Sequence, residues 1–131
     1  MNQQLRAIAR LDRMIHEPGR MMIVALLAAV DECDFRYLIR ETELNKGNLS
    51  SHLAKLEEAG YVEIEKTYRG KVPQTLLRLT RSGRAAFDAY RKELNAALVE
   101  QLQALPKTSK PPSSLLNGPA ALLGDAGLEP S

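Results

Sequence analysis

The chain contains little of what several classes of protein require. It has no tryptophan, one cysteine and 5% aromatic residues among 131 residues. A single cysteine excludes an internal disulfide framework and a zinc site built from several cysteines of one chain. The low aromatic content disfavours a stacking platform for single-stranded nucleic acid and an aromatic ligand cage.

Long apolar segments are absent as well. The longest apolar run, residues 21–30, covers ten residues, about half of the ~20 that a membrane-spanning helix needs. Residues 1–13 carry Arg6, Arg10, Asp12 and Arg13 and lack the apolar core of a secretion signal. We therefore expect a cytoplasmic protein without a membrane partner.

Length and net charge set broad limits on the architecture. A chain of 131 residues suffices for one domain with a modest core. The net charge of +2 is only mildly basic, so the overall charge does not by itself indicate a nucleic-acid partner. The local distribution of charge has to carry that argument.

Apolar spacing predicts an α+β fold, mainly α-helical with a small β-hairpin. Leucine and isoleucine at three- and four-residue spacing predict a helix over residues 5–15. Residues 21–30 are apolar all round, which is typical of a central helix buried on most sides, with Pro18 at its start. A short helix over residues 35–42 follows, capped by Asp34, and a turn over residues 42–45 leads to a helix over residues 46–59 that ends at Gly60.

Alternating residues beyond Gly60 predict the hairpin. Val62 and Ile64 share one face of a first strand, a basic loop covers residues 68–73, and Leu77 and Leu79 share one face of a second strand. Thr80 is expected to cap a long helix that runs to about residue 105. Residues 1–105 are therefore expected to form the domain. Residues 106–131, rich in proline, glycine and serine, are expected to be a disordered tail.

The helix over residues 46–59 has an unusual exposed face. Leu53 and Leu56 fall within ~40° of Leu49 on a helical wheel, and the three leucines form the core stripe. The remaining sides of its first ten residues are small, polar or basic: Lys46, Gly47, Asn48, Ser50, Ser51 and Lys55. Two short helices joined by a tight turn, the second with such a face, are typical of a helix-turn-helix.

This face has the chemistry of a nucleic-acid contact. Small residues let a helix approach a groove closely, and Asn and Ser side chains bond base edges or phosphates. Asn45 is the expected N-cap, so the free N–H groups behind it suit a phosphate oxygen, with Lys46 beside them. We expect Asn48, Ser50 and Ser51 to reach bases or nearby phosphates, and Lys46 and Lys55 to hold the backbone.

Positive charge gathers on the predicted hairpin. Residues 61–84 contain six Lys or Arg against two Glu. Arg69 and Lys71 flank Gly70 at the turn, where both side chains can extend toward a minor groove or its phosphates. Basic residues also protect sheet edges from aggregation. Beside a helix-turn-helix, however, the DNA interpretation is favoured.

Four motifs follow one another along the chain: LDRMIHEPGR (11–20), GNLSSHLAKLEEAGYV (47–62), RGKVP (69–73) and LTRSGR (79–84). In this order they resemble the winged helix DNA-binding domains of small bacterial transcriptional regulators close to the MarR and ArsR families. The resemblance runs from about Leu11 to Tyr90. It implies that the helix over residues 46–59 is a recognition helix and that residues 68–73 form the wing.

The resemblance also implies a homodimer formed through the terminal helices. Phe87, Tyr90, Leu94 and Leu98 recur at helical spacing and offer apolar surface to a second copy. A two-fold dimer on duplex DNA predicts an inverted-repeat operator with half-sites about one helical turn, ~34 Å, apart. We expect no metal ion or organic cofactor, and no residues indicate a site for a small-molecule effector.

Two residues depart from the family pattern. Gly19 stands where a better helix former, often Thr, is common, and is expected to loosen the start of the following helix. Val72 stands at a wing position that is often basic, and is expected to weaken the wing's hold on phosphates.

Three other functions compete with this interpretation. An enzyme is disfavoured, because the chain has two histidines, no nucleophile elbow and no phosphate-binding glycine loop, and His52 is expected to be a hydrogen-bonded structural residue. A metal or redox sensor would depend on Cys33, whose acidic neighbours are expected to raise its pKa. A winged helix used for protein docking would normally lack the basic wing.

Overall fold

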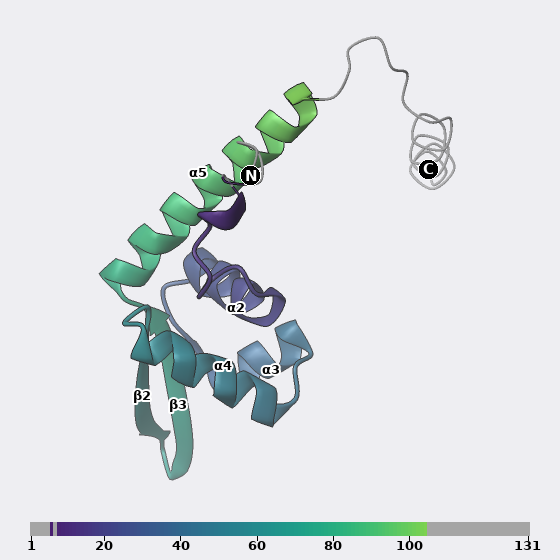
Figure 1. The fold of residues 1–131 in the computed structure, drawn as a ribbon. Coiled ribbons are helices and arrows are strands. Elements are labelled where there is room, and N and C mark those ends of the chain that lie inside the picture. The colour runs from purple at the N-terminus through teal and green to yellow at the C-terminus, as the bar shows by residue number, and fades with distance from the viewer. Residues whose placement is uncertain (1–5, 7, 105–131) are drawn as a thin grey trace, which may run out of the picture. The chain divides into compact units, whose positions relative to one another are not determined.

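The computed structural model describes residue 6 and residues 8–104 (Figure 1). Its elements in chain order are α2 (Pro18–Ala29), β1 (Cys33–Asp34), α3 (Phe35–Thr42), α4 (Lys46–Glu58), β2 (Val62–Arg69), β3 (Val72–Leu79) and α5 (Arg81–Ala104). The predicted α+β class is confirmed. Contacts divide the chain into a first unit that ends at Leu98 and a second that begins at Val99. The predicted tail, residues 106–131, lies outside the described residues.

The main core lies where α2, α3 and α4 meet the sheet. The leucine stripe predicted for α4 is confirmed, because Leu49 and Leu56 are fully buried and Leu53 nearly so. Burial of one such side chain stabilises the fold by about 2 kcal/mol. The other buried members come from α2, α3 and the two long strands: Ile23, Val24, Leu27, Leu38, Val62, Leu77 and Leu79.

Helix α2 is less enclosed than its composition suggested. Pro18 is its first residue, as predicted, and the side chain of Glu17 caps it by accepting from the Arg20 backbone N–H at 2.7 Å. Met22, Ala25 and Ala29 are exposed, so the expectation of burial on most sides is wrong. In the described residues α3, α4 and the sheet cover one side of α2 and leave this stripe open.

The helix predicted over residues 5–15 is shorter in the structure. Residues 6, 8 and 9 are helical, and turns replace the helix from Arg10 onward. One oxygen of the Asp12 carboxylate accepts from the backbone N–H groups of Met14 and Ile15 at 2.8 and 3.3 Å. Such local side-chain bonds compete with helical ones. Leu11 and Ile15 are nevertheless buried, in a small second cluster with Tyr90.

The sheet has three antiparallel strands in the order β1-β3-β2. The predicted faces are confirmed, with Val62, Leu77 and Leu79 buried and Ile64 half-buried. Strand β1, which pairs Cys33 with Leu77, was not predicted, because residues 31–34 are polar and the strand is two residues long.

The hairpin is longer and its turn tighter than predicted. Arg69 pairs with Val72, so only Gly70 and Lys71 form the turn. The backbone φ is +65° at Gly70 and is not positive at Lys71, as in the type II′ turns that match the twist of a hairpin. The expected loop over residues 68–73 is therefore mostly strand.

Candidate nucleic-acid interface

The predicted recognition face of α4 is open. All six of its predicted contact residues, Lys46, Gly47, Asn48, Ser50, Ser51 and Lys55, are exposed. Asn45 is the N-cap, as predicted, because its side chain accepts from the Asn48 backbone N–H at 2.8 Å. The helix therefore presents a fixed, solvent-exposed N-terminus whose partial positive charge suits an anion.

The two wing residues lie at the tip of the β2–β3 hairpin. Arg69 and Lys71 are exposed on either side of Gly70. The hairpin projects beside α4, at the end of the first unit away from α5 (Figure 1). Two further exposed residues near the tip, Tyr68 at 70% and Val72 at 54%, were not predicted as contacts. In the sequence, only the apolar character of these two residues within an otherwise polar turn region could have indicated them.

Two of the six basic residues counted over residues 61–84 have partners within the fold. The Arg78 guanidinium contacts Glu65 at 2.8 Å, Glu32 at 2.9 Å and Glu63 at 3.1 Å. Its hydrogen bonds to Glu65 and Glu63 raise the pKa of Arg78 further above its ordinary value. Arg84 donates to the backbone carbonyl of Ala28 at 3.2 Å. These two arginines have structural partners, which leaves Arg69 and Lys71 at the tip for an external anion.

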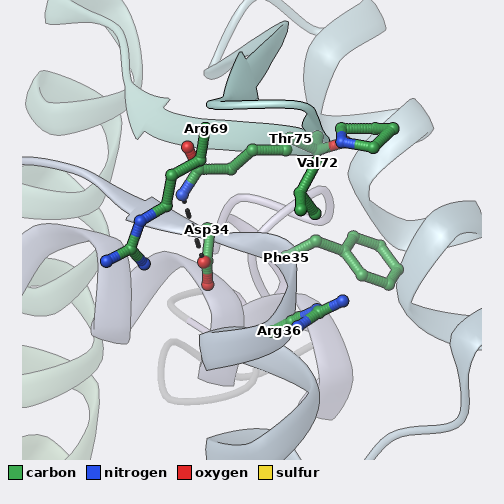
Figure 2. A pocket seen from close by; sticks show the side chains of 8 residues that line it. Asp34, Phe35, Arg36, Arg69, Val72 and Thr75 are labelled. Atoms are coloured by element: carbon green, nitrogen blue, oxygen red, sulfur yellow. Dashed lines mark hydrogen bonds between the residues drawn. The ribbon is translucent and has the colours of Figure 1, made fainter.

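A hollow of about 230 Å³ lies between the wing and the start of α3 (Figure 2). Asp34, Arg36 and Arg69 line it, with Phe35 and Thr75. Gln74 donates to the Asp34 carboxylate at 3.4 Å, and the same side chain caps α3, as predicted, by accepting from the Tyr37 backbone N–H at 2.8 Å. Arg36 and Arg69 are both exposed, so their guanidinium groups face solvent at its rim.

His52 connects α4 to the start of α2. Its Nδ1 lies 3.3 Å from Arg20 Nη1, and its Nε2 lies 3.8 Å from Glu17 Oε1. Arg20 also donates through Nε to the Met14 carbonyl at 2.6 Å. The backbone hydrogen bond from Arg20 lowers the pKa of Glu17, with a smaller contribution from His52. The expected structural role of His52 is thus matched by its contacts.

Gly19 has a packing role that the sequence did not reveal. A Cβ at this position would lie 2.6 Å from His52 Nε2 and 2.8 Å from His52 Cδ2. Glycine therefore lets the imidazole pack directly on the first turn of α2. Glycine at this position therefore allows a close contact between α2 and α4.

The motif over residues 11–20 has a second set of partners. Tyr61 donates its hydroxyl to the Asp12 carboxylate at 2.7 Å, which raises the pKa of Tyr61 to about 12. His16 Nδ1 lies 2.7 Å from the Tyr90 hydroxyl. Tyr90, predicted as surface for a second copy, is only 1% exposed, so that expectation is wrong for this residue. The motif thus links α2 and α4 to the sheet and α5.

Helix α5 begins with a fixed geometry. Thr80 caps it as predicted, because its hydroxyl accepts from the Gly83 N–H at 2.9 Å and donates to the Gly60 carbonyl at 2.6 Å. A Cβ at Gly83 would lie 2.1 Å from the Tyr61 carbonyl oxygen. The motif over residues 79–84 therefore fastens α5 to the start of β2.

The remaining candidates for chemistry are few. Burial, and then the nearby charges of Asp34 and Glu32, raise the pKa of Cys33 to about 11. Within residues 6 and 8–104, no group of three or more His, Cys, Asp or Glu side chains is placed to hold a metal ion. In the same part of the chain, no helix is long and apolar enough to cross a membrane.

Comparison with known proteins supports this geometry. A family model described as a winged helix DNA-binding domain matches residues 20–98. An uncharacterised protein of Methanocaldococcus jannaschii is 43% identical over 76 residues, which covers 57% of this chain and 82% of that protein.

Solved structures of transcriptional regulators share the fold. A transcriptional regulator homologue from Pyrococcus horikoshii OT3 has a TM-score of 0.69 and 25% identity over 77% of this chain and 98% of that chain. A MarR-family transcriptional regulator from Silicibacter pomeroyi has a TM-score of 0.54 and 19% identity over 93% of this chain and 80% of that chain. The second likeness concerns the fold alone.

Proposed function

Because this chain belongs to the winged helix DNA-binding domain family, we propose that it is a transcriptional regulator that binds duplex DNA sequence-specifically as a homodimer. The observation that carries the proposal is the open, small and polar face of α4 beside a basic hairpin tip. Such a face fits the major groove, and the hairpin tip fits the adjacent minor groove or its phosphates.

The proposal assigns roles to the exposed residues. Asn48, Ser50 and Ser51 contact base edges or nearby phosphates, and Lys46 and Lys55 contact the phosphate backbone. Arg69 and Lys71 contact the flanking groove. A two-fold dimer places its α4 helices in successive major grooves, so the operator is an inverted repeat with half-sites ~34 Å apart or a multiple of this distance.

Exposed apolar residues support the dimer. Leu98 on α5 is 55% exposed and Ile8 is 41% exposed. Val99 and Leu102, also on α5, are 41% and 68% exposed. Large apolar residues on a terminal helix are typical of surface that a second copy covers. The proposal includes no metal ion and no cofactor.

Mutations in the wing and in α4 are expected to change DNA binding in different ways. Arg69→Ala weakens binding to every duplex, because a phosphate contact carries no sequence information. Asn48→Ala changes the preference among duplexes, by about 1–3 kcal/mol at the base pair it contacts. Fluorescence anisotropy with the operator and single-base variants measures both effects. The reverse pattern would contradict these assignments.

A further inference from the structure

A second hollow lies between α4 and the hairpin. It has a volume of about 540 Å³ and is lined on one side by Ser50 and Leu53 of α4 and on the other by Ile64 and Lys66 of β2. Phe35 and Thr75 line both this hollow and the smaller one beside Arg36 and Arg69. The two hollows are therefore neighbours, and we call them together the wing groove.

The wing groove has an apolar floor and a polar, cationic rim. Leu53 and Leu77 are buried in the floor, where Phe35 and Ile64 are half-buried. Ser50 and three basic residues line the exposed rim: Arg36, Lys66 and Arg69. Among residues 6 and 8–104, none of these three basic residues forms an ion pair.

Lys66 and the acidic side chains of β2 lie on opposite faces of the hairpin. Side chains alternate along a strand, so Lys66 shares the inner face with Val62 and Ile64. Glu63 and Glu65 project from the outer face, where Arg78 binds both. The inner face of β2 therefore carries Lys66, whereas Glu63 and Glu65 lie on the opposite face.

Two carboxylates also line the wing groove. Asp34 accepts from the Tyr37 backbone N–H and from Gln74, so its oxygens have partners. Glu57 lies seven residues after Ser50 on α4, about 10 Å further along the helix. Three basic residues thus line the wing groove against two carboxylates, one of which has hydrogen-bond partners.

We propose that the wing groove holds one sugar–phosphate strand of the bound duplex, with Lys66 and Arg36 as phosphate contacts. This inference rests on the proposed function. When α4 occupies a major groove and the hairpin tip the adjacent minor groove, the strand that separates the two grooves passes between them. A DNA strand alternates deoxyribose with anionic phosphate, which matches an apolar floor beneath a cationic rim. Ser50 then contacts this strand and not a base edge.

Neutral variants test the inference. In anisotropy titrations with the full chain, Lys66→Gln and Arg36→Gln each weaken binding to the operator and to unrelated duplex by a similar factor. Each phosphate contact removed lowers the salt exponent by about 0.9, and a dimer of either variant loses two contacts, so the affinity lost between 50 and 200 mM salt becomes about twelvefold smaller. Lys66→Arg retains binding, because it keeps the charge. Lys92→Gln, at an exposed position on α5, is the matched control and leaves both quantities unchanged.

A duplex with single neutral methylphosphonates locates the contact. At the phosphate that Lys66 contacts, the substitution weakens DNA binding by the wild-type protein and does not change binding by Lys66→Gln. Wild-type affinity and salt dependence in both Gln variants, with weakened binding by Arg69→Ala, would overturn the wing groove and leave the proposed function intact. Absence of binding to any duplex by the wild-type protein would overturn both.

Discussion

Gly83 illustrates how one absent methyl group fixes the start of a helix. A Cβ there would lie within 3 Å of three backbone atoms of Tyr61, the carbonyl oxygen, carbonyl carbon and Cα, at 2.1, 2.8 and 2.9 Å. Gly83→Ala therefore has to move α5 away from β2. We expect it to lower the free energy of unfolding by about 1–3 kcal/mol, the range typical of overpacking.

Urea denaturation measures this effect, with Ser82→Ala as the control. Ser82 is exposed on the same helical turn, so its replacement should change stability by less than about 0.5 kcal/mol. Equal stability of the two variants would show that α5 is not fastened at Gly83.

The Cys33 thiol is predicted to be unreactive in the folded protein. Its folded pKa is raised from 9.0 to about 11, first by burial and then by Asp34 and Glu32, so the thiol is protonated at neutral pH. We expect slow alkylation by iodoacetamide at pH 7.5 in the native protein and fast alkylation in denaturant. The fold retains the proton longer than the unfolded chain, so this residue's effect is to decrease stability as pH rises from 9 to 11.

Cys33→Ser removes that part of the pH dependence. It also tests the redox-sensor alternative, because the variant should bind duplex DNA as the wild type does before and after mild oxidation. If oxidation abolished binding by the wild type and not by Cys33→Ser, Cys33 would be a sensor and the account of it here would be wrong.

Capping residues could be predicted from the sequence, whereas long-range side-chain pairs could not. Asn45, Asp34 and Thr80 bond backbone groups three residues ahead, so their local sequence is sufficient evidence. Tyr61 and Asp12 are 49 residues apart, and Gly19 depends on a histidine from another helix. Neither pairing leaves a periodic signal in the chain.

At the scale of the element, α4 depends on its first residue. Asn45 supplies the only side chain that the described residues show bonding an N–H of the first turn of α4. We expect Asn45→Ala to lower the free energy of unfolding by about 1 kcal/mol, and Asn45→Ser to leave it nearly unchanged. Thermal unfolding followed by circular dichroism measures both. A fully stable Asn45→Ala variant would mean that tertiary packing alone fixes this helix end.

The elements themselves were predicted with unequal success, for physical reasons. The leucine stripe of α4 and the alternation of the hairpin strands follow from burial on one side, and both are confirmed. The helix over residues 5–15 was predicted from apolar spacing, but the Asp12 side chain satisfies two backbone N–H groups and favours a turn. Strand β1 exists only because β3 offers a free edge, which local sequence does not reveal.

For the whole molecule, the proposed dimer can be tested with a single substitution on α5. Leu98 is 55% exposed on α5. A charge there should oppose burial against a second copy while leaving the fold intact. We expect Leu98→Glu to shift sedimentation from dimer toward monomer and to weaken operator binding, with Lys92→Glu as the control. A monomeric wild type, or a Leu98→Glu variant that remains a dimer, would contradict this surface assignment.

The exposed face of α4 and the basic wing are proposed to bind duplex DNA, and a direct binding measurement tests this proposal. Fluorescence anisotropy with the purified full chain uses duplexes tiling its own upstream region, with excess unrelated duplex as competitor. We expect one duplex to bind tightly in the presence of competitor, with affinity falling ~10³- to 10⁵-fold from 50 to 200 mM salt for 6 to 10 phosphate contacts. A folded dimer that binds no duplex at low salt would contradict the account and favour a protein-docking winged helix.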